Sequence, residues 1–117
     1  MLFRSVQVGC VGSLHVTLRF QGRSAHSARP WQGENAIHKA GPLLAHLLTL
    51  PRREVVNGGF TFYEVLNITQ ASGGRARNVI PEAFALNLNY RFAPGKSVER
   101  AQQDVRELVG EIGRAHV

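Results

Sequence analysis

Strict alternation of apolar and polar residues marks two segments of the chain as half-buried β-strands. Residues 14–21 place every second side chain on one face, and residues 84–92 repeat this pattern. Successive side chains of a strand point to opposite faces, so each segment predicts one apolar and one polar sheet surface. The two apolar faces comprise Leu14, Val16, Leu18 and Phe20, and Phe84, Leu86, Leu88, Tyr90 and Phe92. Residues 60–70 follow an Asn-Gly-Gly turn and are rich in β-branched and aromatic residues, which predicts a third strand.

Apolar residues three and four positions apart predict two helices. The first covers residues 34–50, where Pro42 is expected to kink the helix or shorten its regular part. The second covers residues 98–112, with Ser97 as its N-cap and Gly113 at its end.

The predicted order is strand, helix, strand, strand, helix. This order favours an α+β two-layer sandwich, in which two helices cover one face of an antiparallel sheet. It is one strand short of the ferredoxin-like βαββαβ unit, and the missing strand would begin in the tail at residues 114–117. We therefore expect residues 1–117 to form a single domain that is a piece of a longer protein.

Composition excludes several classes of protein. A chain of 117 residues with 44% hydrophobic and 19% charged residues is typical of one globular domain. The longest mainly apolar stretch, residues 40–50, is too short to span a membrane, and no secretion signal is visible at the start. The single cysteine, Cys10, excludes an internal disulfide, so we expect a cytoplasmic protein with no membrane partner.

The net charge of +6 indicates an anionic partner. Twelve of the 14 basic residues are arginine, and they are scattered along the chain with no run typical of a nucleic-acid tail. A stand-alone ferredoxin-like RNA-binding module is an alternative interpretation. Such modules stack bases on aromatic residues of the open sheet face, whereas the aromatic face of residues 84–92 is expected to meet the helices. We therefore expect no nucleic-acid partner.

The chain encodes no recognisable metal or nucleotide site of its own. It contains no HExxH, CxxC, GxGxxG or P-loop pattern, and Asp104 is the only aspartate. Three polar residues nevertheless stand in unusual places: His26 in a small-residue loop, Asn78 after a glycine-bearing loop, and Arg91 on a polar strand face. Each also has a plain structural interpretation, as a surface histidine, a turn asparagine or a solvated strand residue.

Four phrases in order resemble one protein family. They are GRSAHSARP at 22–30, GENAI at 33–37, GGRARNVIP at 73–81 and NYRFAP at 89–94. Together they resemble the lid, or dimerisation, domain of the zinc-dependent deacylase and exopeptidase family, peptidase family M20. The likeness covers nearly the whole chain, and its details are most similar to the succinyl-diaminopimelate desuccinylase branch.

The resemblance implies roles for individual residues. His26 matches a lid histidine that stabilises the oxyanion in the active site of the partner subunit. Asn78 and Arg91 match residues that hold the substrate, Arg91 through a carboxylate, and Gly73 and Gly74 match a loop whose backbone approaches it. The two zinc ions, or cobalt, would lie in a catalytic domain absent from this chain, so the isolated chain is expected to be inactive.

The resemblance also implies a substrate and a partner. The substrate would be a small dicarboxylate amide, N-succinyl-diaminopimelate, cleaved to succinate and diaminopimelate in lysine and cell-wall precursor synthesis. The partner would be a second copy of the chain, bound through an edge strand at 60–70 and the helix beside it. Another deacylase of the family, or a purely structural dimerisation module, remains an alternative.

Overall fold

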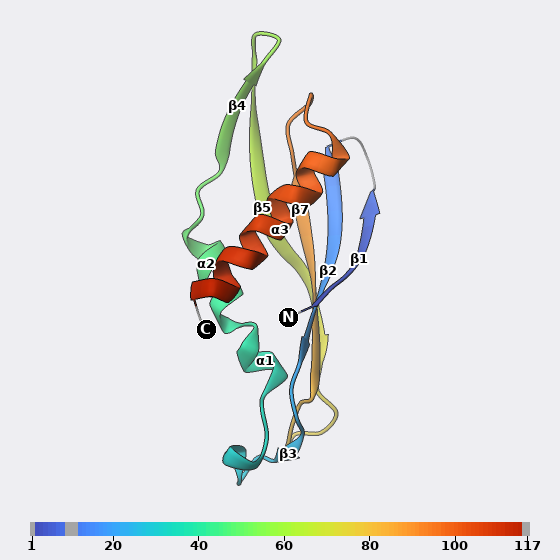
Figure 1. Ribbon diagram of the computed structural model, residues 1–117, viewed down its shortest axis with the longest axis vertical. Coiled ribbons are helices and arrows are strands. Elements are labelled where there is room, and N and C mark those ends of the chain that lie inside the picture. The colour runs from blue at the N-terminus through green and yellow to red at the C-terminus, as the bar shows by residue number, and fades with distance from the viewer. Residues whose placement is uncertain (1, 9–11, 116–117) are drawn as a thin grey trace.

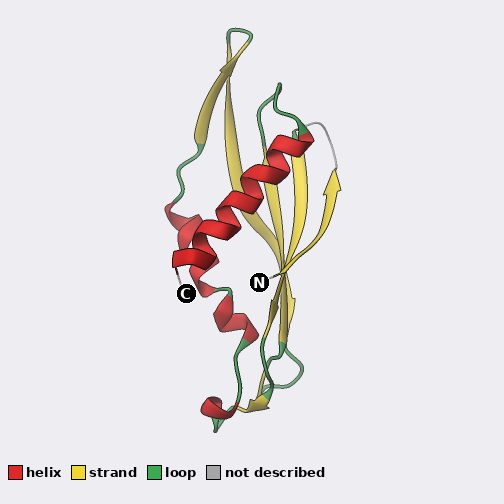
Figure 2. Cartoon of the chain, viewed as in Figure 1, coloured by secondary structure: helices red, strands yellow, loops and turns green. Residues whose placement is uncertain are grey.

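The computed structural model describes residues 2–8 and 12–115, which form a two-layer α+β sandwich (Figures 1 and 2). Five antiparallel strands are arranged in the order β1-β2-β7-β5-β4, and the helices cover one face of this sheet. The predicted fold class is confirmed. The elements are β1 (Leu2–Val8), β2 (Ser13–Gln21), β3 (Ala25–His26), a 3₁₀ turn (Pro30–Gln32), α1 (Ala36–Lys39), α2 (Gly41–Thr49), β4 (Arg53–Asn57), β5 (Phe60–Gly73), β6 (Val79–Ile80), β7 (Ala83–Arg91) and α3 (Val98–Ala115).

The two alternating segments form the centre of the sheet. β2 and β7 pair in unbroken register from Ser13 opposite Arg91 to Gln21 opposite Ala83. Their apolar faces point toward the helices, as predicted, and form the core together with residues of α1, α2 and α3. The buried core residues on these two strands are Leu14, Val16, Leu18, Phe20, Leu86, Leu88 and Tyr90.

The N-terminal segment supplies a strand that the sequence pattern did not predict. β1 pairs antiparallel with β2 and thereby forms the edge strand that the predicted order lacked. A register shift between Phe3 and Ser5 interrupts its alternation, which explains why no period-2 pattern was recognised. The expected end of the last helix at Gly113 is wrong, because α3 continues to Ala115. Residues 116 and 117, where the missing strand was expected to continue, lie outside the described residues.

The strand predicted at 60–70 runs on to Gly73 and is only in part an edge strand. Its first residues, Phe60 to Glu64, pair with β4, which the prediction missed. A two-residue turn joins β4 to β5, with positive φ at Gly58 (62°) and Gly59 (82°) as a type I′ hairpin requires. Residues 65–73 pair with β7 on one side, and no described strand pairs with their other side.

The helix predicted at 34–50 is two helices with a break at Ala40. Asn35, rather than Glu34, begins the first helix, because its Oδ1 accepts the amide hydrogens of Ile37 (2.9 Å) and His38 (3.2 Å). Pro42 stands in the first turn of α2, where a missing amide hydrogen costs nothing. The predicted cap of α3 is confirmed, since the Ser97 Oγ accepts the Arg100 amide hydrogen at 3.0 Å.

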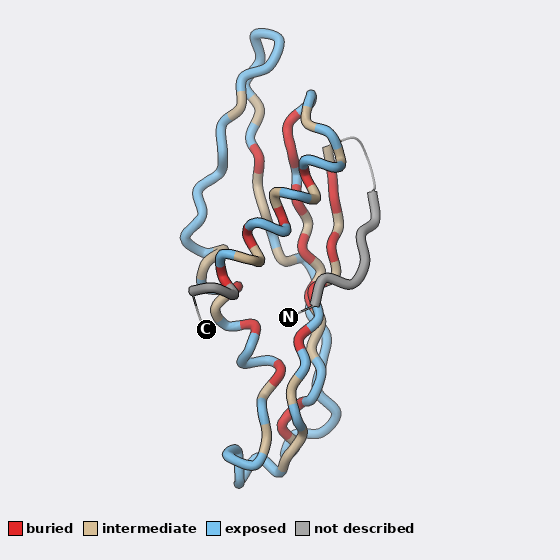
Figure 3. Tube along the Cα trace, viewed as in Figure 1, coloured by how far each residue is buried: buried red, intermediate tan, exposed pale blue. Residues whose placement is uncertain are grey.

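The molecule is elongated, with extents of 58 × 26 × 20 Å. The β4–β5 hairpin, residues 53–64 and hereafter the arm, projects beyond one end of the sheet, and β3 lies at the other end (Figure 1). Burial is concentrated between these two ends (Figure 3). The loops at the β3 end and the tip of the arm are mainly exposed, so both ends offer surface to other molecules.

Candidate functional site

His26 and Asn78, 52 positions apart in the sequence, lie side by side at the β3 end of the domain. β3 pairs antiparallel with β6, which places His26 opposite Val79. The Ser27 amide donates to the Asn78 carbonyl oxygen at 2.9 Å, so the two loops are joined directly beside the histidine. The Asn78 side chain has no hydrogen-bond partner among the described residues, which leaves its carboxamide available to a ligand. We call the surface of residues 22–35 and 74–82 the His26 end.

Two glycines allow the His26 loop to close at its base. A Cβ at Gly22 would stand 2.1 Å from the Glu34 carbonyl oxygen, and one at Gly33 would stand 2.5 Å from that of Arg23. Only glycine therefore permits the backbone pair between Arg23 and Glu34, whose two N–H···O distances are 2.9 and 2.8 Å. The side chains of Arg23 and Glu34 also form an ion pair of 3.5 Å. The histidine is thus carried on a loop fixed at both ends.

The environment of the His26 ring determines which nitrogen carries its proton. The Ala28 amide donates a hydrogen bond to Nδ1 at 3.0 Å, so Nδ1 must accept. In the neutral ring the proton then resides on Nε2, which is left as a donor. The His26 residue is exposed. The geometry therefore presents a hydrogen-bond donor at the surface, held in one tautomer by the backbone.

Gly73 and Gly74 lie where β5 ends and the loop toward Asn78 begins. Gly73 ends β5 opposite Phe84, where a Cβ would stand 2.9 Å from the Ala83 carbonyl oxygen and 2.8 Å from the Phe84 ring. This contact alone requires glycine, for packing rather than for a ligand. Gly74 has φ +92° and open space around its Cα, so a ligand could approach its backbone.

Arg91 lies far from the other predicted site residues. It ends β7 opposite Ser13, whereas the His26 end lies beyond the pair Gln21–Ala83. The nine residues of β7 extend about 27 Å from first to last at roughly 3.4 Å per residue. Arg91 is exposed, and its guanidinium has no partner in the part of the chain that the structure describes. The structure thus brings His26 and Asn78 together and separates Arg91 from both.

The outer face of the sheet carries a polar cluster around His15 that sequence reasoning did not single out. His15 Nδ1 lies 3.1 Å from the Asn87 Nδ2, and its Nε2 lies 3.4 Å from the Asn89 Nδ2. Asn87 also donates to the Thr69 Oγ1 at 2.7 Å, and Asn89 to the Ser13 Oγ at 3.1 Å. The alternation of residues 14–21 and 84–92 predicted this polar face, but the contacts within it depend on the strand register.

A second cluster, also missed, surrounds the Glu64 carboxylate on the helix side of the sheet. Glu64 is 4% exposed and accepts the Ala93 amide hydrogen at 2.9 Å and the Lys96 Nζ at 2.9 Å. Lys96 also bonds to Asp104 at 2.6 Å and to the Tyr90 hydroxyl at 2.8 Å. Glutamate, lysine and aspartate at these positions lack a recognisable spacing, because the cluster combines β5, β7, the following loop and α3.

The pKa values in this cluster reflect burial opposed by hydrogen bonds. Burial, followed by contacts with Asp104 and Glu64, raises the pKa of Tyr90 to about 12. Burial alone would raise the pKa of Glu64, but the bonds from the Ala93 amide and Lys96 lower it below its usual value. The same balance lowers the pKa of Asp104, through Lys96 first and then Tyr90. The carboxylates and the ammonium group are therefore all charged at neutral pH.

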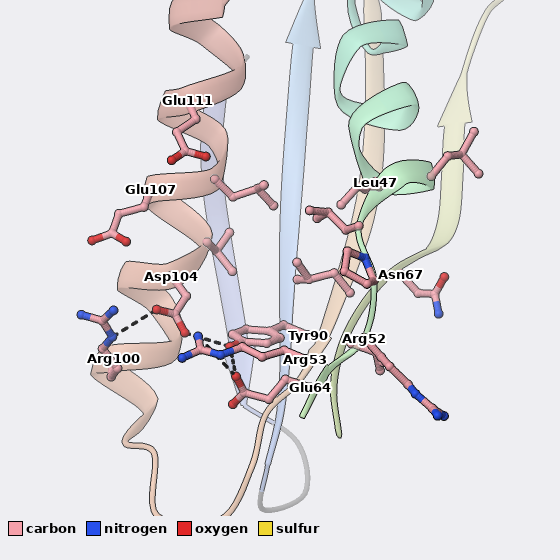
Figure 4. A pocket seen from close by; sticks show the side chains of 17 residues that line it. Leu47, Arg52, Arg53, Glu64, Asn67, Tyr90, Arg100, Asp104, Glu107 and Glu111 are labelled. Atoms are coloured by element: carbon pink, nitrogen blue, oxygen red, sulfur yellow. Dashed lines mark hydrogen bonds and ion pairs between the residues drawn. The ribbon is translucent and has the colours of Figure 1, made fainter. Parts of the chain in front are cut away.

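A cleft of about 550 Å³ opens beside this cluster, between α2, β5 and α3 (Figure 4). Leu47, Leu48 and Leu66 form an apolar side, and Glu64, Arg53, Asp104 and Arg100 form a charged side. His26, Asn78 and Arg91 do not line it. On the charged side, Arg53 is paired with Glu64 at 3.9 Å and Arg100 with Asp104 at 3.1 Å.

Neither a metal centre nor a membrane span is found in the described part of the chain. Residues 2–8 and 12–115 contain no group of three or more histidine, cysteine, aspartate or glutamate residues placed to hold a metal ion. None of the helices in these ranges is long and apolar enough to cross a membrane. The two metal ions implied by the resemblance therefore do not fit the described residues of this domain.

The fold agrees with that of similar proteins. Residues 8–117 match the family described as the peptidase dimerisation domain, of the M20 type. The chain belongs to this family. Among solved structures, the aminobenzoyl-glutamate utilization protein from Klebsiella pneumoniae superposes with a TM-score of 0.65 over 89% of the domain and 25% of that protein, at 19% identity. A tripeptidase from Staphylococcus aureus does so with a TM-score of 0.56, over 86% of the domain and 24% of that protein, at 20% identity.

The M20 dimerisation domain also has sequence relatives with named activities. It is 46% identical over 103 residues to a candidate succinyl-diaminopimelate desuccinylase DapE of Mycobacterium tuberculosis, covering 88% of the domain and 29% of that protein. It is 40% identical to the succinyl-diaminopimelate desuccinylase of Corynebacterium glutamicum, over 89% of the domain and 28% of that protein. A candidate carboxypeptidase of Paracoccidioides lutzii is 35% identical, over 89% of the domain and 24% of that protein. The chain thus spans less than a third of the length of these relatives.

Proposed function

We propose that this dimerisation domain is the lid of a dinuclear-zinc amidohydrolase that cleaves N-succinyl-LL-2,6-diaminopimelate to succinate and diaminopimelate. The family match and the relatives named as desuccinylases support this proposal. The two zinc or cobalt ions would be held by a catalytic domain outside this chain. The lone cysteine fits a reducing compartment, so we propose that the enzyme acts in the cytoplasm.

The observation that carries the proposal is the geometry of His26. An amide carbonyl under attack develops negative charge on its oxygen, and a fixed hydrogen-bond donor at that position stabilises the transition state more than the substrate. His26 offers such a donor, since the Ala28 amide occupies Nδ1 and leaves the Nε2 proton exposed. The free carboxamide of Asn78, across the β3–β6 pair, would hold the adjacent part of the substrate.

We further propose that the domain forms a homodimer through the open side of β5 and the helices beside it. Residues 65–73 of β5 present unpaired backbone groups on one side, an arrangement that favours pairing with another strand. Exposed apolar side chains lie on the adjacent helices: Ile37 is 38% exposed, Leu44 36% and Leu48 88%. The expected interface thus includes the second half of the predicted strand, whereas β4 covers the first half.

Substitution of His26 in the full-length enzyme tests the catalytic role. His26→Ala should lower kcat by about 10²–10³-fold and leave KM nearly unchanged, because the donor acts only on charge that develops in the transition state. His38→Ala is the matched control, since His38 is also exposed and its ring has no partner among the described residues. An unchanged kcat for His26→Ala would contradict the proposal.

A second candidate function is a lid of another M20 deacylase or carboxypeptidase. The 35% identity to a candidate carboxypeptidase supports it, because the lid alone says little about the acyl group. Steady-state kinetics on N-succinyl, N-acetyl and peptide substrates separate the two. A kcat/KM for the succinylated substrate at least tenfold above that for the acetylated analogue is expected for the desuccinylase.

A further inference from the structure

The His26 end carries four arginines, and they fall into two pairs by their contacts. Arg23 is 3.5 Å from Glu34, which Lys39 also contacts at 2.7 Å, and Arg75 is 3.5 Å from Glu82, so each of these two arginines has a carboxylate partner. The guanidinium groups of Arg29 and Arg77 have no ion-pair or hydrogen-bond partner among the described residues, and both residues are exposed. This end therefore carries an uncompensated charge of two guanidinium groups.

The backbone places these two arginines on the loops that carry His26 and Asn78. The Arg29 amide donates to the His26 carbonyl oxygen at 2.9 Å, within one tight turn. Arg77 directly precedes Asn78, whose carbonyl oxygen accepts the Ser27 amide hydrogen at 2.9 Å. Both arginines thus lie on the two loops that the Ser27–Asn78 bond joins, and both loops are fixed by backbone contacts.

We propose that Arg29 and Arg77 bind a carboxylate of the substrate close to the scissile amide, and so set the specificity of the His26 end. This inference rests on the proposed function of His26. A guanidinium group presents a planar fork of donors that matches a carboxylate, and two unpaired cations on joined loops favour binding of an anion. The substrate class is therefore an N-acyl amino acid that carries a negative charge within a few bonds of the amide.

This carboxylate is distinct from any that Arg91 binds in the same lid. Arg91 lies at the opposite end of β7, about 27 Å from the pair Gln21–Ala83 beyond which the His26 end begins. A small substrate that contacts His26 cannot reach the Arg91 of the same lid. An enzyme whose active site uses Arg29 and Arg77 of one lid and Arg91 of another would accordingly prefer substrates with two separate carboxylates over substrates with one.

Calorimetric titration of the full-length enzyme tests the proposal without turnover. The probes are succinate and diaminopimelate, each compared with its diamide, in which amide groups replace both carboxylates. In the double variant Arg29→Gln/Arg77→Gln, the affinity for one of the two acids should fall about 10- to 100-fold, the range for losing charge-assisted hydrogen bonds. The affinity for the corresponding diamide should not fall by more than about twofold, since the amide offers no negative charge for the guanidinium groups to bind.

Arg75→Gln is the matched control, because Arg75 lies two positions from Arg77 but is paired with Glu82. It should leave all four affinities unchanged. Equal affinities of the double variant and the parent enzyme for both acids would overturn the proposal, as would an equal loss for the acids and their diamides. The double variant Arg29→Lys/Arg77→Lys keeps both positive charges but lacks the planar guanidinium donors. It should therefore retain only part of the parent enzyme's affinity for the acid.

The outcome separates this inference from the proposed function. His26→Ala removes the oxyanion donor and leaves Arg29 and Arg77 in place, so its acid affinities should match those of the parent enzyme. Reduced kcat in His26→Ala together with unchanged acid binding in the arginine double variant rejects the carboxylate site alone. Normal kcat in His26→Ala together with lost acid binding in the double variant rejects the histidine role alone.

Discussion

The Glu64 carboxylate links the arm to the loop after β7 and to α3. It is buried, with its oxygens bonded to the Ala93 amide and the Lys96 ammonium, and Lys96 in turn bonds to Asp104 on α3. The Arg53 guanidinium is 3.9 Å away on β4. A single side chain thus holds the segment that follows Arg91. Its loss should lower the stability of the whole domain.

Glu64→Gln should lower the free energy of unfolding of this chain by about 1–3 kcal/mol, because a buried charge-assisted hydrogen bond is weakened while Lys96 stays in place. Urea unfolding at neutral pH measures the change. Glu34→Gln is the matched control: the Glu34 side chain is 48% exposed and paired with Lys39 at 2.7 Å, so little change is expected. Equal effects of the two substitutions would contradict the importance assigned to burial.

The same carboxylate predicts a dependence of stability on pH. Glu64 has a pKa below its model-compound value of 4.5, so its contribution is fully present above that pH. It is lost progressively as the pH falls through the lower pKa of the folded state. The stability difference between the parent chain and Glu64→Gln should therefore shrink below pH 4.5. A difference that grows on acidification would have the wrong sign.

At the scale of the elements, the start of α1 depends on one side chain. Asn35 Oδ1 accepts the amide hydrogens of Ile37 and His38, and the helix that it caps has only four residues. Asn35→Ala should lower the free energy of unfolding by about 1 kcal/mol, the usual cost of losing an N-cap. Asn35→Asp keeps an acceptor in place and should retain most of the stability. An alanine variant as stable as the aspartate variant would show that this cap contributes nothing.

Long elements with a clear period were predictable from the sequence, and short ones were not. β2, β7 and α3 each bury one face, so their apolar residues recur at a fixed spacing. β3 and β6 have two residues each, too few for any period, and β4 has a pattern too short to separate from the preceding Pro51 and arginines. Pro42 correctly predicted an interrupted helix, but not that the break falls at Ala40.

The candidate site was also predictable only in part. The residues themselves were found through the family resemblance, since histidine and asparagine in loops carry no periodic signal. That His26 adjoins Asn78 depends on the two-residue β3–β6 pairing, and that Arg91 lies apart depends on the β2–β7 register. Neither can be derived from spacing along the chain. The unpaired state of Arg29 and Arg77 likewise emerges only when Glu34 and Glu82 are seen to pair with other arginines.

At the scale of the whole molecule, the elongated shape determines how many active sites one domain can serve. His26 and Arg91 lie at opposite ends of a sheet in a molecule 58 Å long. If both residues contact substrate, as the family resemblance implies, they must do so in different active sites. In a dimer, both residues can contact the same substrate if each active site takes Arg91 from one subunit and His26 from the other.

Mixing inactive variants of the full-length enzyme tests this arrangement. His26→Ala and Arg91→Ala homodimers each lack one residue in every site. In a heterodimer, one site receives the intact Arg91 of the first chain and the intact His26 of the second, whereas the other site lacks both. Random exchange of subunits should therefore restore about a quarter of the parent activity, since half of the dimers carry one complete site each. If instead one lid supplied both residues to a single site, every heterodimer would hold two defective sites. No recovery despite demonstrated heterodimers would then reject the division of His26 and Arg91 between two active sites.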